Sequence, residues 1–350
     1  MEYSSASVGK GVEQDDLVMP VINFQGFLTG DSKARAEVGA AILKAFKTSG
    51  FLYLSNHGVS ESMIQQAFDH SAKFFARPQI QKDQLAWTNA KQNRGYLASG
   101  REKLTNIGVE SAKERNANPD LKETMEIGWD GIASKPNKWP EHFDEDGAAF
   151  AKFMREFFDT MQDLNQNFMQ AVALGMGLDE DFFHGYIDAK DNNMRLLHYP
   201  PVKKSIFKEN NGLMRVRAGE HSDYGSITLL LQDSTGGLEV KSPKNTWVGA
   251  TPIPGTIVVN AGDLLSRWSN DEIKSTKHRV IQPPPKPDER DDDDPDATLP
   301  DRYSIAYFCI PNFNAYIDAL PGTWELTEIG KKYPGVLSGE YQLQRLAETF

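Results

Sequence analysis

The stretch that decides the fold is Ala218-Gly219-Glu220-His221-Ser222-Asp223-Tyr224-Gly225-Ser226-Ile227-Thr228-Leu229-Leu230-Leu231-Gln232, residues 218–232. Gly225 divides it into two segments of strand length, and the second is rich in branched apolar residues. Other short segments of this kind, separated by Gly, Pro and Asn, lie on both sides of it, at 194–199, 238–240, 256–260, 278–281 and 302–309. Several short strands at this spacing are typical of a β-sandwich or barrel.

The first half of the chain has a different pattern. Residues 19–24 and 51–54 predict two strands, and between them Asp31 or Ser32 can cap a helix with apolar side chains at helical spacing. A second helix is expected over 61–75, and a long one carries phenylalanine and methionine between residues 150 and 172. The intervening region, 86–140, is polar and predicted to be rich in loops.

These patterns predict an α+β protein with helices first and a β-core second. We expect four regions: a flexible N-terminus over 1–17, a helix-rich region over 18–180 that packs on the core, the core itself over 190–320, and a C-terminal helical segment over 321–350. The helix-rich region is expected to act as a buttress for the core. A Pro- and Asp-rich insertion, 282–301, falls between two predicted strands. Its four adjacent aspartates lack the alternating spacing of a calcium loop, so a solvated, mobile loop is expected.

Composition excludes several classes of partner. The chain has 350 residues, with 38 basic and 49 acidic side chains and a net charge of −11. This balance argues against nucleic acid and against an anionic membrane surface, because both need a basic footprint. A single cysteine, Cys309, excludes an internal disulfide framework, and the polar N-terminus lacks the apolar segment of a signal peptide. We therefore expect a soluble, cytoplasmic protein with a small-molecule substrate, while the sequence does not indicate its oligomeric state.

His221 and Asp223 are candidate metal ligands. Alternate side chains of a strand share one face, so these two point the same way. A third ligand can come from His278, at the start of another short strand. Two imidazoles and one carboxylate form the facial triad of non-haem iron(II), which leaves two coordination positions for a chelating co-substrate and one for dioxygen. Zinc also accepts this set of ligands, so the triad alone does not decide the metal.

Arg302 and Ser304 form a second candidate site. They share one face of a predicted strand with Ala306 and Phe308. A guanidinium beside a hydroxyl suits a carboxylate, because the planar fork binds it bidentately and the hydroxyl adds a hydrogen bond. The alternative is a structural ion pair between Arg302 and an aspartate of the protein. The metal triad favours the ligand-binding interpretation.

At these residues the chain resembles the iron(II)- and 2-oxoglutarate-dependent dioxygenases of the isopenicillin N synthase-like group. The resemblance covers nearly the whole chain. Besides His221-x-Asp223 and Arg302-x-Ser304, the motifs that carry it are Pro20–Phe24, Gly50–Gly58, Phe74–Pro78, Arg94–Tyr96, Arg195–Pro201, Asn260–Asp263 and His278–Val280. The resemblance implies a distorted double-stranded β-helix, or jelly roll.

The resemblance also implies a cofactor set and roles for single residues. His221, Asp223 and His278 would bind Fe(II), while Arg302 and Ser304 would bind the distal carboxylate of 2-oxoglutarate. Tyr199 matches a tyrosine that often supports this carboxylate. The reactants would be the substrate, 2-oxoglutarate and dioxygen, and the products would include succinate and carbon dioxide. Some members keep the Arg-x-Ser pair without using 2-oxoglutarate, so the pair implies a carboxylate ligand more firmly than it implies which one.

The substrate is less well indicated. Fungal members of the family, including one that hydroxylates the pyrimidine thymine, carry motifs similar to those at 195–200 and 217–221. Arg195 shares a strand face with Tyr199 and could donate hydrogen bonds to carbonyl groups, and Phe308 could stack on a flat molecule. The alternatives are a structural ion pair for Arg195 and a core position for Phe308. Tyr224 is a further candidate if the strand bends there, whereas strand parity turns His198 away from the site.

Three functions follow from these observations. The first is hydroxylation of a small planar molecule such as a pyrimidine. The second is a tailoring reaction of secondary metabolism, which can be desaturation, cyclisation or hydroxylation. The third is a non-catalytic jelly-roll protein that binds ligands without turnover. The intact triad and carboxylate pair argue against the third.

Overall fold

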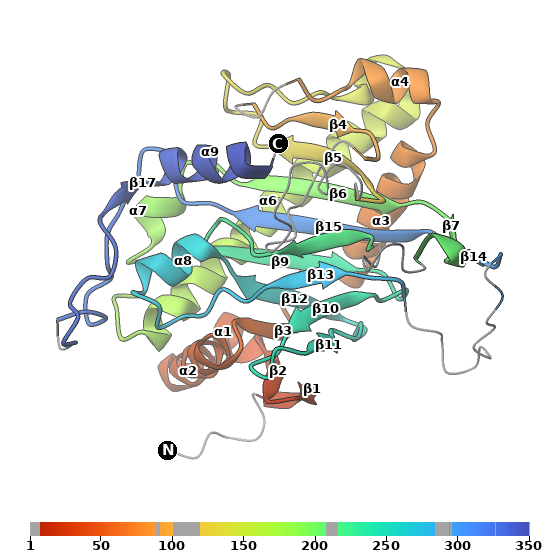
Figure 1. Cartoon of the computed structure of the whole chain (residues 1–350). Coiled ribbons are helices and arrows are strands. Elements are labelled where there is room, and N and C mark those ends of the chain that lie inside the picture. The colour runs from red at the N-terminus through yellow and green to blue at the C-terminus, as the bar shows by residue number, and fades with distance from the viewer. Residues whose placement is uncertain are drawn as a thin grey trace.

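The computed structural model describes residues 8–88, 92–100, 120–207, 216–283, 294, 296–325 and 327–349 (Figure 1). Its largest element is a nine-stranded sheet with the order β1-β2-β3-β12-β9-β15-β6-β5-β4. The strands are, in that order, Val8–Gln14, Leu17–Asn23, Phe51–Ser55, Thr256–Ala261, Ile227–Gln232, Arg302–Cys309, Asn193–Tyr199, Glu123–Gly128 and Gly95–Leu97. Strands β2 and β3 are parallel, and the other pairs in this sheet are antiparallel.

A second sheet has four strands in the order β11-β10-β13-β8. They are Trp247–Gly249, Leu238–Lys241, His278–Val280 and Ala218–His221. Two short ladders complete the strands of the described residues: β14 (Thr298–Leu299) pairs with β7 (Val202–Lys203), and β16 (Tyr316–Ile317) pairs with β17 (Val336–Leu337). The protein is therefore a mixed helix-and-strand fold built around one large and one smaller sheet.

The large sheet is buried on both faces. Along β12, Ile257 and Val259 belong to the core on the helical side, whereas Val258 between them belongs to the core on the other side. This second core also contains Leu238 and Val240 of the smaller sheet. Because side chains alternate across a strand, each central strand supplies residues to both cores at once. The space between the two sheets is where the candidate site lies.

The helices on the other face explain why the large sheet can be apolar there. Helices α2 (Ser32–Thr48) and α6 (Glu145–Gly175) pack closely together, and a Cβ atom added at Gly39 would lie 2.6 Å from the carbonyl oxygen of Ala171. Helix α3 (Glu61–Phe75) packs beside α6. The remaining helices are α1 (Gln25–Thr29), α4 (Gln79–Gln84), α7 (His184–Ile187), α8 (Asp263–Trp268) and α9 (Ser338–Thr349), with short 3-10 turns at Pro140–His142 and Lys204–Phe207.

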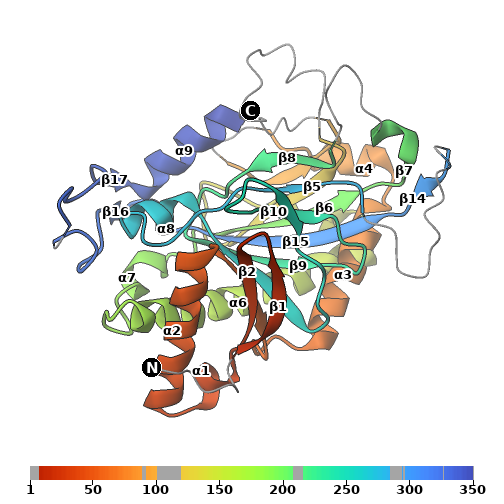
Figure 2. The same cartoon turned by 60° about the horizontal axis from the view of Figure 1, so that its bottom comes forward.

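The helix predictions are confirmed at their N-termini. The Asp31 carboxylate accepts a hydrogen bond from the backbone N–H of Ala34 at 2.9 Å, as an N-cap does. Helix α3 spans the expected residues, Glu61–Phe75, and its cap is Ser60. At the other end of the chain, the described helix α9 begins at Ser338 and so occupies the last part of the expected helical segment. In Figure 2, α9 lies at the upper left beside β17, apart from α2 and α6.

One prediction about the N-terminal half is wrong, and another is incomplete. Residues 8–14, placed in a flexible terminus, form the edge strand β1, which pairs with β2. Backbone hydrogen bonds hold an edge strand whose side chains stay polar, so its sequence carries little apolar signal. The region 86–140, predicted to be rich in loops, also contains the short strands β4 and β5, which add an edge to the large sheet. Their three and six residues are too short to give a clear period, although all are buried.

Some of the segments discussed in the sequence analysis lie outside the described residues. Most of the 282–301 insertion, including Asp291 to Asp293, lies outside them, as do residues 1–7 of the expected flexible terminus. The end of the insertion is described, and there β14 pairs with β7. Within the described ranges, none of the helices combines the length and the apolar character that crossing a membrane requires.

Candidate active site

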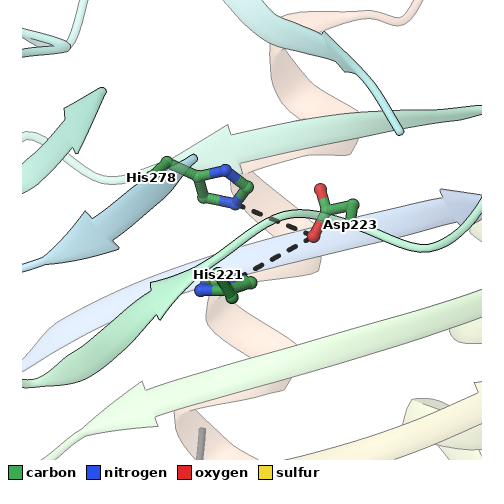
Figure 3. Close-up of side chains that lie close together, drawn as sticks. All are labelled: His221, Asp223 and His278. Atoms are coloured by element: carbon green, nitrogen blue, oxygen red, sulfur yellow. Dashed lines mark ion pairs between the residues drawn. The ribbon is translucent and has the colours of Figure 1, made fainter. Parts of the chain in front are cut away.

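The three predicted metal ligands lie together. One ligand atom from each of His221, Asp223 and His278 falls within 4.8 Å of the others, and no second group of this kind occurs among the described residues. Asp223 Oδ1 lies 3.8 Å from His221 Nε2 and 3.7 Å from His278 Nε2, and Figure 3 draws both contacts. The pairing of β8 with β13 explains this proximity, because His221 and His278 are directly opposite each other in the ladder.

Hydrogen bonds fix the orientation of both imidazole rings. His221 Nδ1 lies 2.8 Å from the carbonyl oxygen of Gly219, and His278 Nδ1 lies 3.2 Å from that of Thr276. A carbonyl oxygen can only accept, so each Nδ1 carries the proton and each Nε2 has a free lone pair. The two lone pairs are on the atoms that face Asp223. This is the tautomer that a metal ligand needs.

The two oxygens of Asp223 have different environments. Oδ2 accepts hydrogen bonds from Thr228 Oγ1 at 2.6 Å and from Asn260 Nδ2 at 2.8 Å, whereas Oδ1 faces the histidines. The carboxylate is 7% exposed, so water cannot replace these partners freely. One oxygen is therefore held by the protein and the other is directed at the space between the rings. A cation that accepts nitrogen and oxygen ligands fits this arrangement.

Electrostatics favour the forms that bind a cation. Burial lowers the pKa of His221 to about 4, and the neighbouring His278 acts in the same direction. Burial alone would raise the pKa of Asp223, but the neighbouring histidines and the hydrogen bonds from Asn260 and Thr228 bring it below its ordinary value. At neutral pH the site is a neutral imidazole beside an ionised carboxylate, which is the state a metal ion requires.

The Arg302 guanidinium lies deeper between the sheets. It is 1% exposed, donates from Nε to the carbonyl oxygen of Gly236 at 2.7 Å, and lies 3.4 Å from Ser304 Oγ through Nη1. Its central carbon is 4.8 Å from the centre of the Tyr199 ring, which faces it across the β15–β6 pair. No carboxylate forms an ion pair with Arg302 in the described part of the chain. A buried guanidinium in this state can take an anion.

A cavity of about 160 Å³ joins these two groups. All nine residues predicted from the sequence line it: His221, Asp223, His278, Arg302, Ser304, Tyr199, Arg195, Phe308 and Tyr224. Alternation along a strand explains several of these positions. On β15, Arg302, Ser304, Ala306 and Phe308 all face the cavity. His198 points the other way, where its ring stacks on Tyr303 and lies between Glu123 and Asp301.

Tyr224 reaches the cavity because its strand is shorter than predicted. Strand β8 ends at His221, so the backbone no longer alternates at residues 222–226. The guanidinium carbon of Arg345, on α9, lies 4.5 Å from the centre of the Tyr224 ring. Arg345 also donates to Asp263, whose backbone N–H donates to the carbonyl oxygen of Asp223. The C-terminal helix is thereby attached to the loop that carries the metal ligand.

Arg195 lies in the half of the cavity away from Arg302. Its Nε is 2.5 Å from Oε1 of Glu126, a completely buried residue of β5, and its guanidinium carbon is 5.5 Å from the centre of the Phe308 ring. Glu126 also accepts a hydrogen bond from Asn193. Arg195 thus has an ion-pair partner and also lines the cavity. A structural ion pair and a role in substrate binding are therefore compatible for this residue.

Sequence reasoning missed the other polar residues of this half. Among them are Arg94, Glu126, Lys135 and Asp191, and all of these except Glu126 line the cavity. Burial lowers the pKa of Arg94 to about 10 and that of Lys135 to about 8, and it raises the pKa of Asp191. The Arg94 side chain occupies the space that a Cβ at Gly128 would need, which ties it to β5. The usable signal was the alternation Met125–Ile127 around Glu126, a short strand with a charged residue on one face.

Comparisons with known proteins identify two family models in the chain. The 2OG-Fe(II) oxygenase superfamily model matches residues 190–311, and the model described as non-haem dioxygenase in morphine synthesis N-terminal matches residues 19–142. The first range contains all nine predicted site residues. The second contains Arg94 and Glu126.

Solved structures and curated proteins agree with the family models. The full-length thymine 7-hydroxylase of Neurospora crassa, solved in complex with alpha-KG, is 49% identical, with 97% of this chain and 100% of that chain covered and a TM-score of 0.87. The same enzyme has also been solved with alpha-KG and thymine. The 2-oxoglutarate-dependent dioxygenase htyE of Aspergillus rugulosus is 32% identical over 90% of this chain and 93% of its own length. The proline hydroxylase buaE of Petromyces alliaceus is 33% identical over 87% and 91%.

Proposed function

Because this chain belongs to the 2OG-Fe(II) oxygenase superfamily and is a 2-oxoglutarate-dependent dioxygenase, we propose that it hydroxylates a C–H bond of a small planar molecule such as a pyrimidine, with thymine as the first candidate. The observation that carries the proposal is the cavity itself, which has a metal-ligand cluster between a buried guanidinium and an arginine–aromatic pair. In the same proposal the facing sheets are the jelly-roll core, and the helices of residues 18–180 are its buttress.

We assign the inner half of the cavity to the cofactors. His221 and His278 would bind iron(II) through Nε2 and Asp223 through Oδ1, because these are the atoms that the surrounding hydrogen bonds leave available. Arg302 and Ser304 would bind the distal carboxylate of 2-oxoglutarate, with the Tyr199 ring against the guanidinium. When bound, iron and 2-oxoglutarate would supply the activation of dioxygen, with one oxygen atom going to the substrate and the other to succinate as carbon dioxide is released.

The outer half of the cavity would hold the substrate. The Arg195 guanidinium is held by Glu126, lines the cavity, and is the type of group that donates hydrogen bonds to the carbonyl oxygens of a pyrimidine. Phe308, beside Arg195, offers an aromatic face for stacking, and Tyr224 offers a second one near the metal ligands. These residues orient a flat ring and exclude water from the reacting carbon. The Neurospora crassa enzyme has been solved with thymine and with 5-formyluracil, and this supports a pyrimidine as the first substrate to try.

A tailoring oxidase is the second candidate function. It is favoured by the curated relatives, which include htyE and the proline hydroxylase buaE at about one third identity over most of the chain. The outer half of the cavity carries Arg94, Lys135 and Asp191 in addition to Arg195, so its polar groups are not limited to those that a pyrimidine ring would use. The substrate of a tailoring oxidase would be oxidised at the same metal site in the inner half of the cavity.

The test of the cofactor assignment needs no substrate. The protein is mixed anaerobically with iron(II) and 2-oxoglutarate, and the weak visible charge-transfer band of the chelate is recorded. We expect the band in the wild type, its loss in His221→Ala, and a much higher 2-oxoglutarate requirement in Arg302→Ala. Arg155→Ala is a control, because Arg155 lies on α6 and pairs with Asp130 away from the cavity. If the folded, iron-loaded wild type shows no band, the cofactor assignment is refuted. A non-catalytic binding protein then becomes the better hypothesis.

The test of the substrate uses thymine and uracil as a matched pair. The two rings present the same carbonyl and N–H groups, but uracil lacks the methyl group. We expect thymine to stimulate formation of succinate and to gain one oxygen atom by mass spectrometry, whereas uracil should bind without being hydroxylated. If thymine neither binds nor reacts while the iron–2-oxoglutarate band is normal, the tailoring function becomes the better proposal, and a panel of amino-acid and aromatic metabolites follows.

A further inference from the structure

Arg217 is a second buried guanidinium close to the co-substrate half of the cavity, and no part of the function described above uses it. The residue is 0% exposed. Its Nε and Nη1 atoms are buried and have no hydrogen-bond partner among the described residues, while Nη2 donates to the carbonyl oxygen of Pro300 at 3.2 Å. A buried donor without a partner is costly, and a buried cation is more so. Such a group needs an explanation.

The position of Arg217 connects the metal strand with the co-substrate strand. It directly precedes β8, which ends at His221, and Pro300 lies two residues before Arg302. The Tyr199 ring is common to both guanidinium groups: its centre is 5.9 Å from the central carbon of Arg217 and 4.8 Å from that of Arg302. The two cations are therefore no further apart than the sum of these distances.

The charges around this pair do not balance. No carboxylate of the described residues forms an ion pair with either guanidinium. The nearest acids are committed elsewhere, since Asp233 accepts from the backbone N–H groups of Tyr303 and Thr235, and Asp301 binds His198. Burial and the charge of Arg302 lower the pKa of Arg217 to about 10, so it stays protonated at neutral pH. Asp233 and Asp301 offset part of this charge without an ion pair, so in the described part of the chain the two cations make a site of positive potential.

We propose that Arg217 is a positioning residue for 2-oxoglutarate, whose field adds to that of Arg302 and draws the distal carboxylate of the co-substrate into the space beside Tyr199. The inference rests on the proposed function, because it takes Arg302 and Ser304 as the carboxylate site. Arg217 does not line the cavity itself, so it acts through the low-dielectric interior rather than by contact. Its contribution should therefore depend on charge and favour a dicarboxylate over a monocarboxylate.

A purely structural role is the competing explanation. Arg217 Nη2 bonds the Pro300 carbonyl, and its backbone N–H donates to the carbonyl oxygen of Val280 at 2.8 Å. Loss of the side chain could shift the start of β15 and with it Arg302. Three variants separate the two roles. Arg217→Met removes charge and hydrogen bond, Arg217→Gln removes the charge but keeps a donor for Pro300, and Arg217→Lys keeps the charge.

The experiment measures the affinity of the iron(II)-loaded protein for two 2-oxo acids anaerobically, by titration of the visible band. One is 2-oxoglutarate, and the other is 2-oxopentanoate, which has the same chain length but no distal carboxylate. We expect Arg217→Met and Arg217→Gln to weaken 2-oxoglutarate binding about tenfold, the equivalent of about 1.4 kcal/mol, and to leave 2-oxopentanoate binding unchanged. Arg217→Lys should retain most of the wild-type affinity. Iron content and thermal unfolding temperature are measured for each variant.

The possible outcomes separate a failure of the Arg217 proposal from a failure of the proposed function. If wild type shows no band with either acid, the proposed function fails and the inference falls with it. A normal wild-type band with unchanged 2-oxoglutarate affinity in Arg217→Gln overturns the inference alone. Equal weakening of both acids also overturns it, because the proposed field acts on the distal carboxylate, which 2-oxopentanoate lacks. A loss of 2-oxoglutarate affinity in Arg217→Lys as large as in Arg217→Met overturns it too, because a displaced Arg302 would weaken 2-oxoglutarate binding whatever the charge at residue 217. Should Arg217→Met fail to fold, the comparison of Arg217→Gln with Arg217→Lys gives the same decision.

Discussion

The inner and outer halves of the cavity are built in different ways. The inner half is made by residues that are close in sequence or paired on neighbouring strands: His221 with Asp223, His221 opposite His278, and Arg302 opposite Tyr199. The outer half also uses a strand pair, because Glu126 of β5 lies directly opposite Arg195 of β6 and holds it, but it needs further segments as well. Arg345 of α9 covers Tyr224, and Arg94 and Lys135 come from the N-terminal region. Strand pairing therefore fixes the first half, whereas the second also depends on packing of a helix and loops outside the core strands.

The reaction depends on the inner half of the cavity, and the choice of substrate depends on the outer half. The spacing of metal ligands and carboxylate binders is a local property of strands, so it can stay constant while other segments change. The outer half depends on what the N-terminal region and the C-terminal helix bring to it, so one chemistry can serve many substrates. The relative named as a proline hydroxylase and the thymine 7-hydroxylase of Neurospora crassa, each similar to this chain over most of its length, are consistent with this division.

The largest effect is expected from removing a metal ligand. His278→Ala should abolish iron binding and reduce turnover by at least about a thousandfold, because the remaining two ligands cannot hold the ion on one face. Iron content and succinate formation measure this. His184→Ala is the matched control, since His184 is exposed and lies outside the cavity. The outer half should keep its structure, seen as an unchanged near-UV circular dichroism spectrum; retention of stoichiometric iron would contradict the assignment.

The next effect separates the two halves directly. Arg195→Met should lower kcat/KM about a hundredfold, because it removes the donors proposed to orient the substrate and leaves Glu126 buried without its cation. The iron–2-oxoglutarate band should be unchanged. Arg279→Met is a close control: Arg279 has a similar ion pair, 2.7 Å to Glu239, and a similar aromatic contact, but it does not line the cavity. If both variants lose activity equally, the effect is one of general packing.

A smaller effect tests how the inner half is supported. Asn260→Ala removes the 2.8 Å hydrogen bond to Asp223 Oδ2 and should weaken iron affinity between about 10- and 100-fold, as loss of such support typically does. Competition with a chelator measures the affinity. Asn192→Ala is the control, because that amide is equally buried but bonds Tyr307 and Gln162 instead. An unchanged iron affinity would mean that Thr228 alone is enough to hold the carboxylate.

The same division explains what the sequence could predict. The period of two along Arg302–Phe308 was enough to place four side chains in the cavity, and the His-x-Asp spacing was enough to pair two ligands. These inferences need only the geometry of one strand. Arg94 and Lys135 lie outside the strands and could not be found in this way. For Glu126, the alternation in β5 places a charged side chain on one face, but no local pattern of so short a strand says which edge of a sheet it will join. Tyr224 was uncertain because the point where a strand ends depends on its neighbours.

The smallest effect concerns pH, and it should appear in the outer half alone. Burial lowers the pKa of Lys135 from 10.5 to about 8, and Arg94 contributes in the same direction. Between these two values the unfolded chain keeps the proton that the folded protein has lost, so unfolding takes up a proton and becomes less favourable as pH rises. Relative to Lys135→Met, the wild type should gain about 1 kcal/mol of unfolding free energy between about pH 7.5 and 9.5, a value reduced for partial exposure.

Urea unfolding of both proteins at the two pH values measures this difference. Lys138→Met is the control, since Lys138 is a neighbouring, partly buried lysine that does not line the cavity. The 2-oxoglutarate affinity should stay constant while the outer half titrates, because Lys135 is not part of the proposed carboxylate site. An equal pH response in Lys135→Met and in the wild type would mean that the lysine is solvated, with its Nζ not held at 3.2 Å from the centre of the Phe313 ring. The outer half would then be more open than the inner half.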